Sequence, residues 1–221
     1  GLPMGAMYAA DLFGMALFSL MQVRLGEVDG ATTQIVVMLT SIAYLPGVGL
    51  ALAGTTLVGQ AIGAGDRDWA RRLGNRVIIV TTTYMGAVGV LLAALGPWVM
   101  PLLVSASDPQ AAEVVKLGLV LLWIAAGYQL FDGLQLGSGF ALRGAGDVRV
   151  PALIFLGLSW GVFVPLAHML SFAPGQGWFD VLPQFGLGAV GGWFGLLTYV
   201  VLLAVGMLLR WRSGRWQRIR I

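Results

Sequence analysis

The sequence predicts an all-α polytopic membrane protein, and three observations lead to that fold class. Hydrophobic residues make up 58% of the 221 residues and charged residues only 10%, whereas a soluble domain carries about 25% charged residues. Mean hydropathy is +0.85. The polar residues gather between apolar stretches, and each stretch is long enough to cross a hydrocarbon core of roughly 30 Å at 1.5 Å per residue.

We expect six membrane-spanning helices that form one transmembrane domain over residues 1–221. The expected spans are 2–23, 31–63, 76–103, 111–142, 150–172 and 184–209. The second span is longer than a bilayer requires, which predicts a bend at Pro46 or an end that projects into solvent. The sequence opens inside an apolar segment without an initiator Met, so we expect that the start of the protein is missing.

Basic residues gather on one side of the predicted bilayer. Eleven of the 13 Lys and Arg residues follow the second, fourth and sixth spans, and only Arg24 and Lys116 lie on the other side. The positive-inside rule then places both ends in the cytoplasm. The loop 174–183 would face outward. Because the basic residues follow apolar runs, they indicate topology rather than a nucleic-acid partner.

Asp132 lies in the middle of the fourth apolar span. A charged side chain there costs about 2.5–3.5 kcal/mol on membrane-insertion scales, so it is a functional candidate by default. Tyr128 and Gln135 share its helix face through spacings of four and three residues. The alternative is a structural carboxylate that only hydrogen-bonds a neighbouring helix.

Asp11 is a second acidic residue at membrane depth, about ten residues or roughly 15 Å into the first span. Tyr8, Met15 and Phe18 share its helix face. Asp132 lies about eleven residues before the basic end of its own span, so we expect both carboxylates at similar depth. Two acids at one level can share a proton or bind a cation jointly, which we favour over two unrelated buried acids.

Four segments carry a family resemblance. They are LPMGAMYAAD, LVGQAIGAGD followed by WARR, YQLFDGLQ leading into ALRGAGDVRVP, and GAVGGWFGL. In order and approximate spacing they resemble the C-terminal six-helix lobe of the multidrug and toxic compound extrusion (MATE) transporters, across essentially the whole chain. The resemblance implies one lobe of a twelve-helix transporter, with an N-terminal six-helix lobe as its missing partner.

The resemblance also implies a function: a cation-coupled antiporter that exports amphipathic, often cationic drugs by alternating access. The family's cation-site positions fall on Asp11, Asp132 and Tyr128, so H⁺ or Na⁺ is expected there and no other cofactor. Gln34 matches a position near the substrate path in some members. Residues that share a helix face or lie beside these positions are candidates for the substrate path, with plain core packing as the alternative: Tyr8, Met15, Phe18, Phe131 and Gln135.

Three other functions are alternatives. A lipid-linked sugar flippase of the same superfamily needs a strongly cationic cavity, whereas the expected cavity is acidic. A rhomboid-like serine protease needs Ser138 and His168 at one depth, yet we expect them near opposite ends of their spans. A non-transporting assembly partner has no need of two costly carboxylates. We therefore expect a transporter rather than an enzyme, with membrane lipid and small organic cations as its partners.

Overall fold

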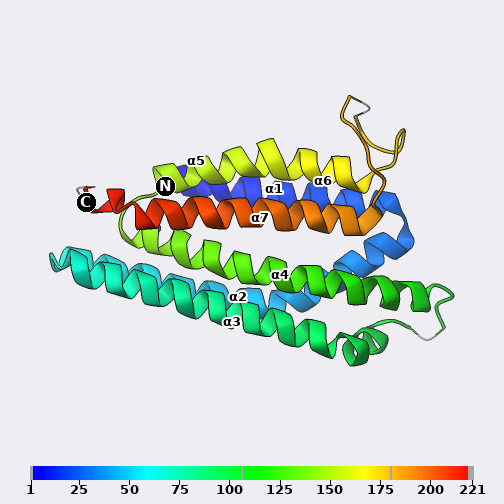
Figure 1. Ribbon diagram of the computed structural model, residues 1–221, viewed down its shortest axis with the longest axis horizontal. Helices are drawn as coiled ribbons and strands as arrows, with labels where there is room; N and C mark the ends of the chain where they lie inside the picture. Colours follow the sequence, from blue (N-terminus) through cyan, green and yellow to red (C-terminus); the bar gives the residue numbers. More distant parts are fainter. Residues whose placement is uncertain (1, 106, 180, 219–221) are drawn as a thin grey trace.

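The computed structural model describes residues 2–105, 107–179 and 181–218, and the chain in these ranges is almost entirely helical (Figure 1). The elements in chain order are α1 (Leu2–Leu25), α2 (Glu27–Gly63), α3 (Arg67–Leu103), α4 (Ala111–Gly144), α5 (Arg149–Leu158), the π-helical turn η1 (Ser159–Phe163), α6 (Val164–Ser171), α7 (Gly188–Arg212) and the 3-10 turn η2 (Arg215–Arg218). None of the described residues forms a strand. The predicted all-α class is confirmed.

Five helical segments in the described ranges are long and apolar enough to cross a membrane: α2, α3, α4, the continuous segment from α5 to α6, and α7. α1 has 24 residues and packs alongside α5, α6 and α7. The arrangement is consistent with the expected lobe of six helices. The chain is a multi-pass membrane protein.

Three helix starts differ by four residues or more from the sequence-based expectation. α2 begins at Glu27 rather than at residue 31. α3 begins at Arg67 rather than at residue 76, because Asp66 caps it: the Asp66 carboxylate accepts the backbone N–H of Trp69 at 2.7 Å. The arginines of this region, from Arg67 to Arg76, therefore lie in the first turns of α3 instead of in a loop. The last helix begins at Gly188 rather than at residue 184.

α2 continues through Pro46 without a break in its helical assignment. Pro46 is exposed on the helix surface. A proline inside a helix removes one backbone hydrogen bond, but the flanking turns of a membrane helix keep theirs, since lipid offers no alternative partner. The expected extra length is present, because the helix has 37 residues.

The helices divide into two sets, with α2, α3 and α4 on one side and α1, α5, α6 and α7 on the other (Figure 1). α4 packs against α2, α3 and α7, so it joins the sets. Close approach of α3 and α4 depends on glycine: the Thr81 hydroxyl donates to the carbonyl of Gly133 at 3.0 Å. A Cβ on Gly133 would lie only 2.7 Å from the carbonyl oxygen of Thr81.

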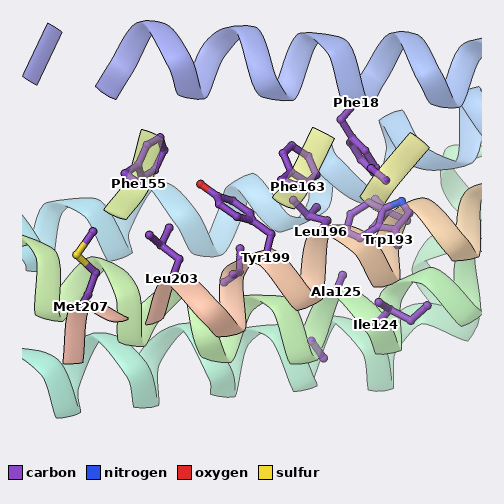
Figure 2. Packing of buried hydrophobic residues seen from close by; sticks show 14 of the residues in the cluster. Phe18, Ile124, Ala125, Phe155, Phe163, Trp193, Leu196, Tyr199, Leu203 and Met207 are labelled. Carbon is purple, nitrogen blue, oxygen red and sulfur yellow. The ribbon is translucent and has the colours of Figure 1, made fainter. Parts of the chain in front are cut away.

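An aromatic cluster forms the core between α1, η1 and α7 (Figure 2). Phe18 packs edge-on against Trp193 with ring centroids 6.0 Å apart. Phe163 stacks on Tyr199 at 5.1 Å. Such pairs are favourable beyond the area they bury. The cluster holds α7 in position, and α7 in turn presents Trp193 and Tyr199 to the cavity described below.

Both chain ends lie at one end of the bundle, and the segment between α6 and α7 projects at the other end (Figure 1). This segment returns along the end of α6, where Phe185 N–H donates to Met169 O at 2.9 Å. The Nε2 atom of His168 accepts the backbone N–H of Trp178 at 3.0 Å, and Arg24 on α1 donates to Gln176 O at 3.0 Å. The projecting segment is therefore tied to the bundle.

Candidate functional site

A cavity of about 390 Å³ lies between the two sets of helices, and α1, α2, α4, α5 and α7 supply its walls. Its size is within the range of small-molecule sites. The polar part of its lining consists of Asp11, Thr40, Ser41, Tyr44, Tyr128, Gln129, Asp132, Gln135 and Tyr199. The other eight lining residues are apolar or aromatic, so polar and apolar side chains line the cavity in about equal number.

Asp132 is the most deeply buried acid in this cavity, with only 4% of its surface exposed. Its Oδ2 atom is inaccessible and has no hydrogen-bond partner among the described residues. A buried carboxylate oxygen without a donor is costly when ionised. The arrangement therefore suits a carboxylate that holds a proton or faces a cation.

Asp11 lines the same cavity from α1 and is half-buried. The two carboxylates line one cavity from different helices. Because α1 and α4 are far apart in the sequence, only the tertiary fold brings the two carboxylates together. Two like charges in one apolar cavity favour uptake of a positive charge.

Tyr128 lines the cavity one helical turn before Asp132. Its ring packs edge-on against Trp193, with centroids 6.5 Å apart, which fixes the ring in the wall of the cavity. The three residues expected at the cation site, Asp11, Tyr128 and Asp132, thus line one cavity. Their role in binding a cation stays a prediction.

Gln129 sets the rotation of α4. It is completely buried, and its Nε2 donates to the carbonyl of Thr40 on α2 at 2.8 Å. With this contact pointing toward α2, the residues on either side of it in the helical turn, Tyr128 and Asp132, face the cavity. The Nε2 bond of Gln129 therefore joins α4 to α2, while its Oε1, like Asp132 Oδ2, has no hydrogen-bond partner among the described residues.

The expected substrate-path residues divide into two groups. Met15 and Gln135 line the cavity. Phe18 is 1% exposed and belongs to the aromatic core, while Phe131 is half-buried and packs against the same core; neither is among the residues that line this cavity. A helix turns by 100° per residue, so Phe131 points away from the direction of its neighbour Asp132.

Gln34 and Tyr8 are placed differently. Gln34 is exposed on α2 and does not line the cavity, because the preceding Thr33 faces α7 and accepts the indole N–H of Trp193 at 3.3 Å. The side chain of Tyr8 lies outside the described part of the structure. The role of either residue in a substrate path stays a prediction.

Sequence reasoning missed the contribution of α2 and α7 to the cavity. Thr40, Ser41 and Tyr44 line it from α2, and Tyr199 lines it from α7. A signal was present, since the three α2 residues share one helix face in the middle of an apolar span. Their polarity alone did not tell which helix that face would meet.

A smaller cavity of about 110 Å³ adjoins the first and shares Asp11, Tyr44, Gln135 and Phe155 with it. It reaches Arg143 in the last turn of α4 and Asp147 just after that helix. Asp147 is buried and paired with Arg210 of α7, with Nε and Oδ2 2.6 Å apart. The Cζ atom of Arg143 lies 5.6 Å from the ring centroid of Phe140.

The described residues give little support for other chemistry. They contain no group of three or more His, Cys, Asp and Glu side chains that could hold a transition metal. Ser138 is buried, and its hydroxyl has no hydrogen-bond partner within the described ranges, so it makes no hydrogen bond to His168. The contact that a serine protease dyad requires is absent.

A family model described as MatE matches residues 3–169 of this chain. The chain is 36% identical over 222 residues to "Probable multidrug resistance protein NorM" of Pseudomonas aeruginosa, covering 97% of this chain and 42% of that protein. It is 30% identical over 212 residues to a protein of the same name from Brucella suis, with coverages of 96% and 43%. The chain thus spans less than half the length of these relatives.

Two solved structures have a similar fold. A crystal structure of MATE in the bent conformation superposes with a TM-score of 0.79 at 17% identity, over 99% of this chain and 45% of that chain. The MATE transporter ClbM in complex with Rb⁺ superposes with a TM-score of 0.77 at 18% identity, over 97% and 48%. At these identities the likeness concerns the fold.

Proposed function

Because the chain belongs to the MatE family, we propose that it forms one six-helix lobe of a cation-coupled exporter, in which Asp11, Asp132 and Tyr128 bind the coupling ion. One observation carries this proposal: the buried Asp132 carboxylate shares a cavity with Asp11 and has an oxygen without a hydrogen-bond partner in the described ranges. An acidic side chain at membrane depth costs free energy, so its presence there indicates that its charge has a function.

The coupling follows from competition for one pair of carboxylates. A proton or Na⁺ that enters from outside neutralises part of their charge and weakens their attraction for an organic cation. The organic cation is then released outward, and the ion leaves on the inner side. A bound species shifts a conformational equilibrium only through its differential affinity for the two states. Asp11 and Asp132 supply that difference in affinity, both for the coupling ion and for the organic cation.

The two candidate ions make different demands on the site. A proton needs only one carboxylate oxygen. An alkali cation prefers several hard oxygen ligands, and the carboxylates of Asp11 and Asp132 together with the Tyr128 hydroxyl form such a set. Ion-replacement measurements distinguish the two.

The exported class fits the cavity lining. Aromatic faces from Tyr44, Trp193 and Tyr199 stand beside the acids, and such faces attract organic cations. Met15 adds a flexible apolar contact, which suits loose specificity. The relatives named as multidrug resistance proteins support drugs as the exported molecules. We therefore propose amphipathic drugs, often cationic, as the substrates.

Alternating access requires a second lobe that rocks against this one. We propose an N-terminal six-helix lobe as that partner, since the chain covers only 42–43% of the length of its relatives. We propose that both ends of this chain face the cytoplasm and that the membrane is a bacterial inner membrane; the positions of the basic residues and the bacterial relatives support this.

Replacing each acid in the whole transporter that contains this chain tests the proposal. Asp11→Asn and Asp132→Asn should each abolish efflux of ethidium from vesicles driven by a proton or Na⁺ gradient. Because the two groups act as one site, the double variant should be about as impaired as either single variant. Asp68→Asn is the matched control, since Asp68 is exposed at the start of α3.

Measuring efflux with each ion gradient separately identifies the coupling ion. If Asp132→Asn exports ethidium with unchanged ion dependence, the carboxylate is structural and the proposed mechanism is wrong. Correct membrane insertion of every variant is checked by its yield and by its elution as a single species.

A further inference from the structure

The adjoining smaller cavity ends in a positive charge that the proposed function does not use. We propose that Arg143 is an anion subsite, which binds a carboxylate on the exported molecule while Asp11 and Asp132 hold the cationic group of the same molecule. This inference rests on the proposed function. It adds zwitterionic amphiphiles to the proposed substrate class. It also assigns the residue that binds their negatively charged end.

Arg143 is a cation whose hydrogen-bonding capacity is not used up. Its Nη1 atom is inaccessible and has no hydrogen-bond partner in the ranges that the structure describes. The nearby acid is already engaged, because Asp147 pairs with Arg210 of α7. A buried guanidinium nitrogen without an acceptor is unfavourable, and other atoms of the same side chain line the cavity. A small rotation of the guanidinium toward that cavity would let a bound carboxylate supply the missing acceptor.

The surroundings of the Arg143 guanidinium favour the binding of an anion. Its Cζ lies 5.6 Å from the ring centroid of Phe140, and this cation–π contact restricts its movement. The planar fork of an arginine matches the two oxygens of a carboxylate. Apolar side chains such as Val48 and Met207 line the same cavity, which strengthens the charge interaction relative to water.

The spacing of charges sets the shape of the ligand. Asp132 and Arg143 are eleven residues apart on α4, a rise of roughly 16 Å. Asp11 lines both cavities and therefore lies between these limits. A drug-sized molecule with an amine at one end and a carboxylate at the other can reach from the acids toward Arg143.

A topology role does not account for this arginine. A residue that only marks the cytoplasmic side reaches toward lipid headgroups or water, as the exposed Arg149 does. Arg143 instead lines a cavity inside the bundle. Arg149 therefore provides a control with the same charge at the same end of the helix bundle.

Binding of two matched dyes to the 221-residue chain in phosphatidylcholine nanodiscs tests the inference. Rhodamine B carries a free carboxylate, and its methyl ester lacks that charge but keeps the cationic ring system. Fluorescence anisotropy gives the dissociation constant of each. We expect the wild-type chain to bind the acid about ten-fold more tightly than the ester, as for a hydrogen bond between charged groups.

Variants separate the subsite from general effects of charge. Arg143→Gln should remove the preference for the acid and leave ester binding unchanged, whereas Arg149→Gln should keep the preference. Arg143→Lys should keep only part of it, because an ammonium lacks the fork. The lysine variant also carries the test if the glutamine variant does not insert.

Each contrary result has a distinct meaning. Equal weakening of both dyes by Arg143→Gln, or the same effect from Arg149→Gln, overturns the subsite. If the wild-type chain binds neither dye, the proposed drug cavity itself fails. If it binds the ester but does not prefer the acid, only the subsite fails.

Discussion

Polar side chains inside the bundle fall into two kinds that can be told apart by their partners. The hydroxyl of Thr81 and the amide of Gln129 each donate to a backbone carbonyl of another helix, at 3.0 and 2.8 Å. Such bonds hold helices together in lipid. Asp132 Oδ2 has no hydrogen-bond partner among the described residues. Other buried oxygens there share this property, such as Gln129 Oε1, but Asp132 Oδ2 is the one that belongs to an acidic side chain. A charge that packing does not use is the feature that points to function.

Tyr128→Phe should impair the transporter less than loss of either carboxylate. The change removes one ligand oxygen but keeps the ring that packs edge-on against Trp193. We expect weaker apparent affinity for the coupling ion, by several-fold, with ion-driven efflux still measurable in vesicles. Tyr84→Phe on α3 is the control, since Tyr84 does not line this cavity. Complete loss of transport in Tyr128→Phe would mean that the hydroxyl has a role beyond ligation.

Residues on one helix face could be predicted from the sequence, whereas partners across helices could not. The spacing of Tyr128, Asp132 and Gln135 predicts a shared face, and all three line the cavity. Tyr199 on α7 carries an equally good hydroxyl, but its meeting with the acids depends on how α7 packs against α1 and η1. Periodicity defines a face of a helix and says nothing about which helix it will meet.

Helix α4 is the element on which the arrangement depends. It contacts α2 and α3 on one side and α7 on the other, and it supplies four of the polar residues of the cavity. Its contact with α3 is close because glycine stands at Gly133 and Gly137. Small residues let two helices approach so that interhelical hydrogen bonds can form.

Gly133→Ala should destabilise the lobe, whereas Gly49→Ala should not. A Cβ at Gly133 meets backbone atoms of α3, which cannot move aside without separating the helices; at Gly49 nothing lies within 4 Å. Overpacking of this kind costs about 1–3 kcal/mol. Thermal unfolding in nanodiscs should show a lower midpoint for Gly133→Ala only. Equal midpoints for both variants would show that α3 and α4 can adjust at this contact.

Helix ends and irregular turns were the least predictable elements. Four arginines between residues 67 and 76 suggested a cytoplasmic loop, but the Asp66 cap lets them continue as helix. The π-helical turn at Ser159–Phe163 had no clear signal. It directly precedes Pro165, whose ring cannot donate a backbone hydrogen bond, and a widened turn is one way for a helix to accommodate that loss.

At the scale of the whole molecule, one end of the bundle differs from the other in charge. Both chain ends and the turn between α2 and α3 lie at the end rich in arginine, and the segment from residue 173 to 187 lies at the opposite end (Figure 1). Lys and Arg concentrate on the cytoplasmic side of membrane proteins. The fold is therefore consistent with the orientation expected from the sequence.

Single cysteines test this orientation without background, because the chain contains none of its own. Ala64 is exposed in the turn after α2, and Val181 is 93% exposed in the segment between α6 and α7. In intact cells a membrane-impermeant maleimide should label Val181→Cys and not Ala64→Cys. After permeabilisation both should react. The reverse pattern in intact cells would invert the topology and the assignment of every loop.

The chain alone should bind drugs but not transport them. Its cavity is lined by residues of this chain, so a ligand can enter it, yet alternating access needs a second lobe to close the opposite wall. The chain also covers only 42% of the length of its relative from Pseudomonas aeruginosa. Proteoliposomes of the isolated chain should therefore show no ion-driven efflux of ethidium, while anisotropy still detects ethidium binding.

Joining the chain to the N-terminal half of that relative should restore efflux if the two halves pack. Robust efflux by the isolated chain would mean that two copies assemble face to face, which a concentration-dependent rate and cross-linking between copies would confirm.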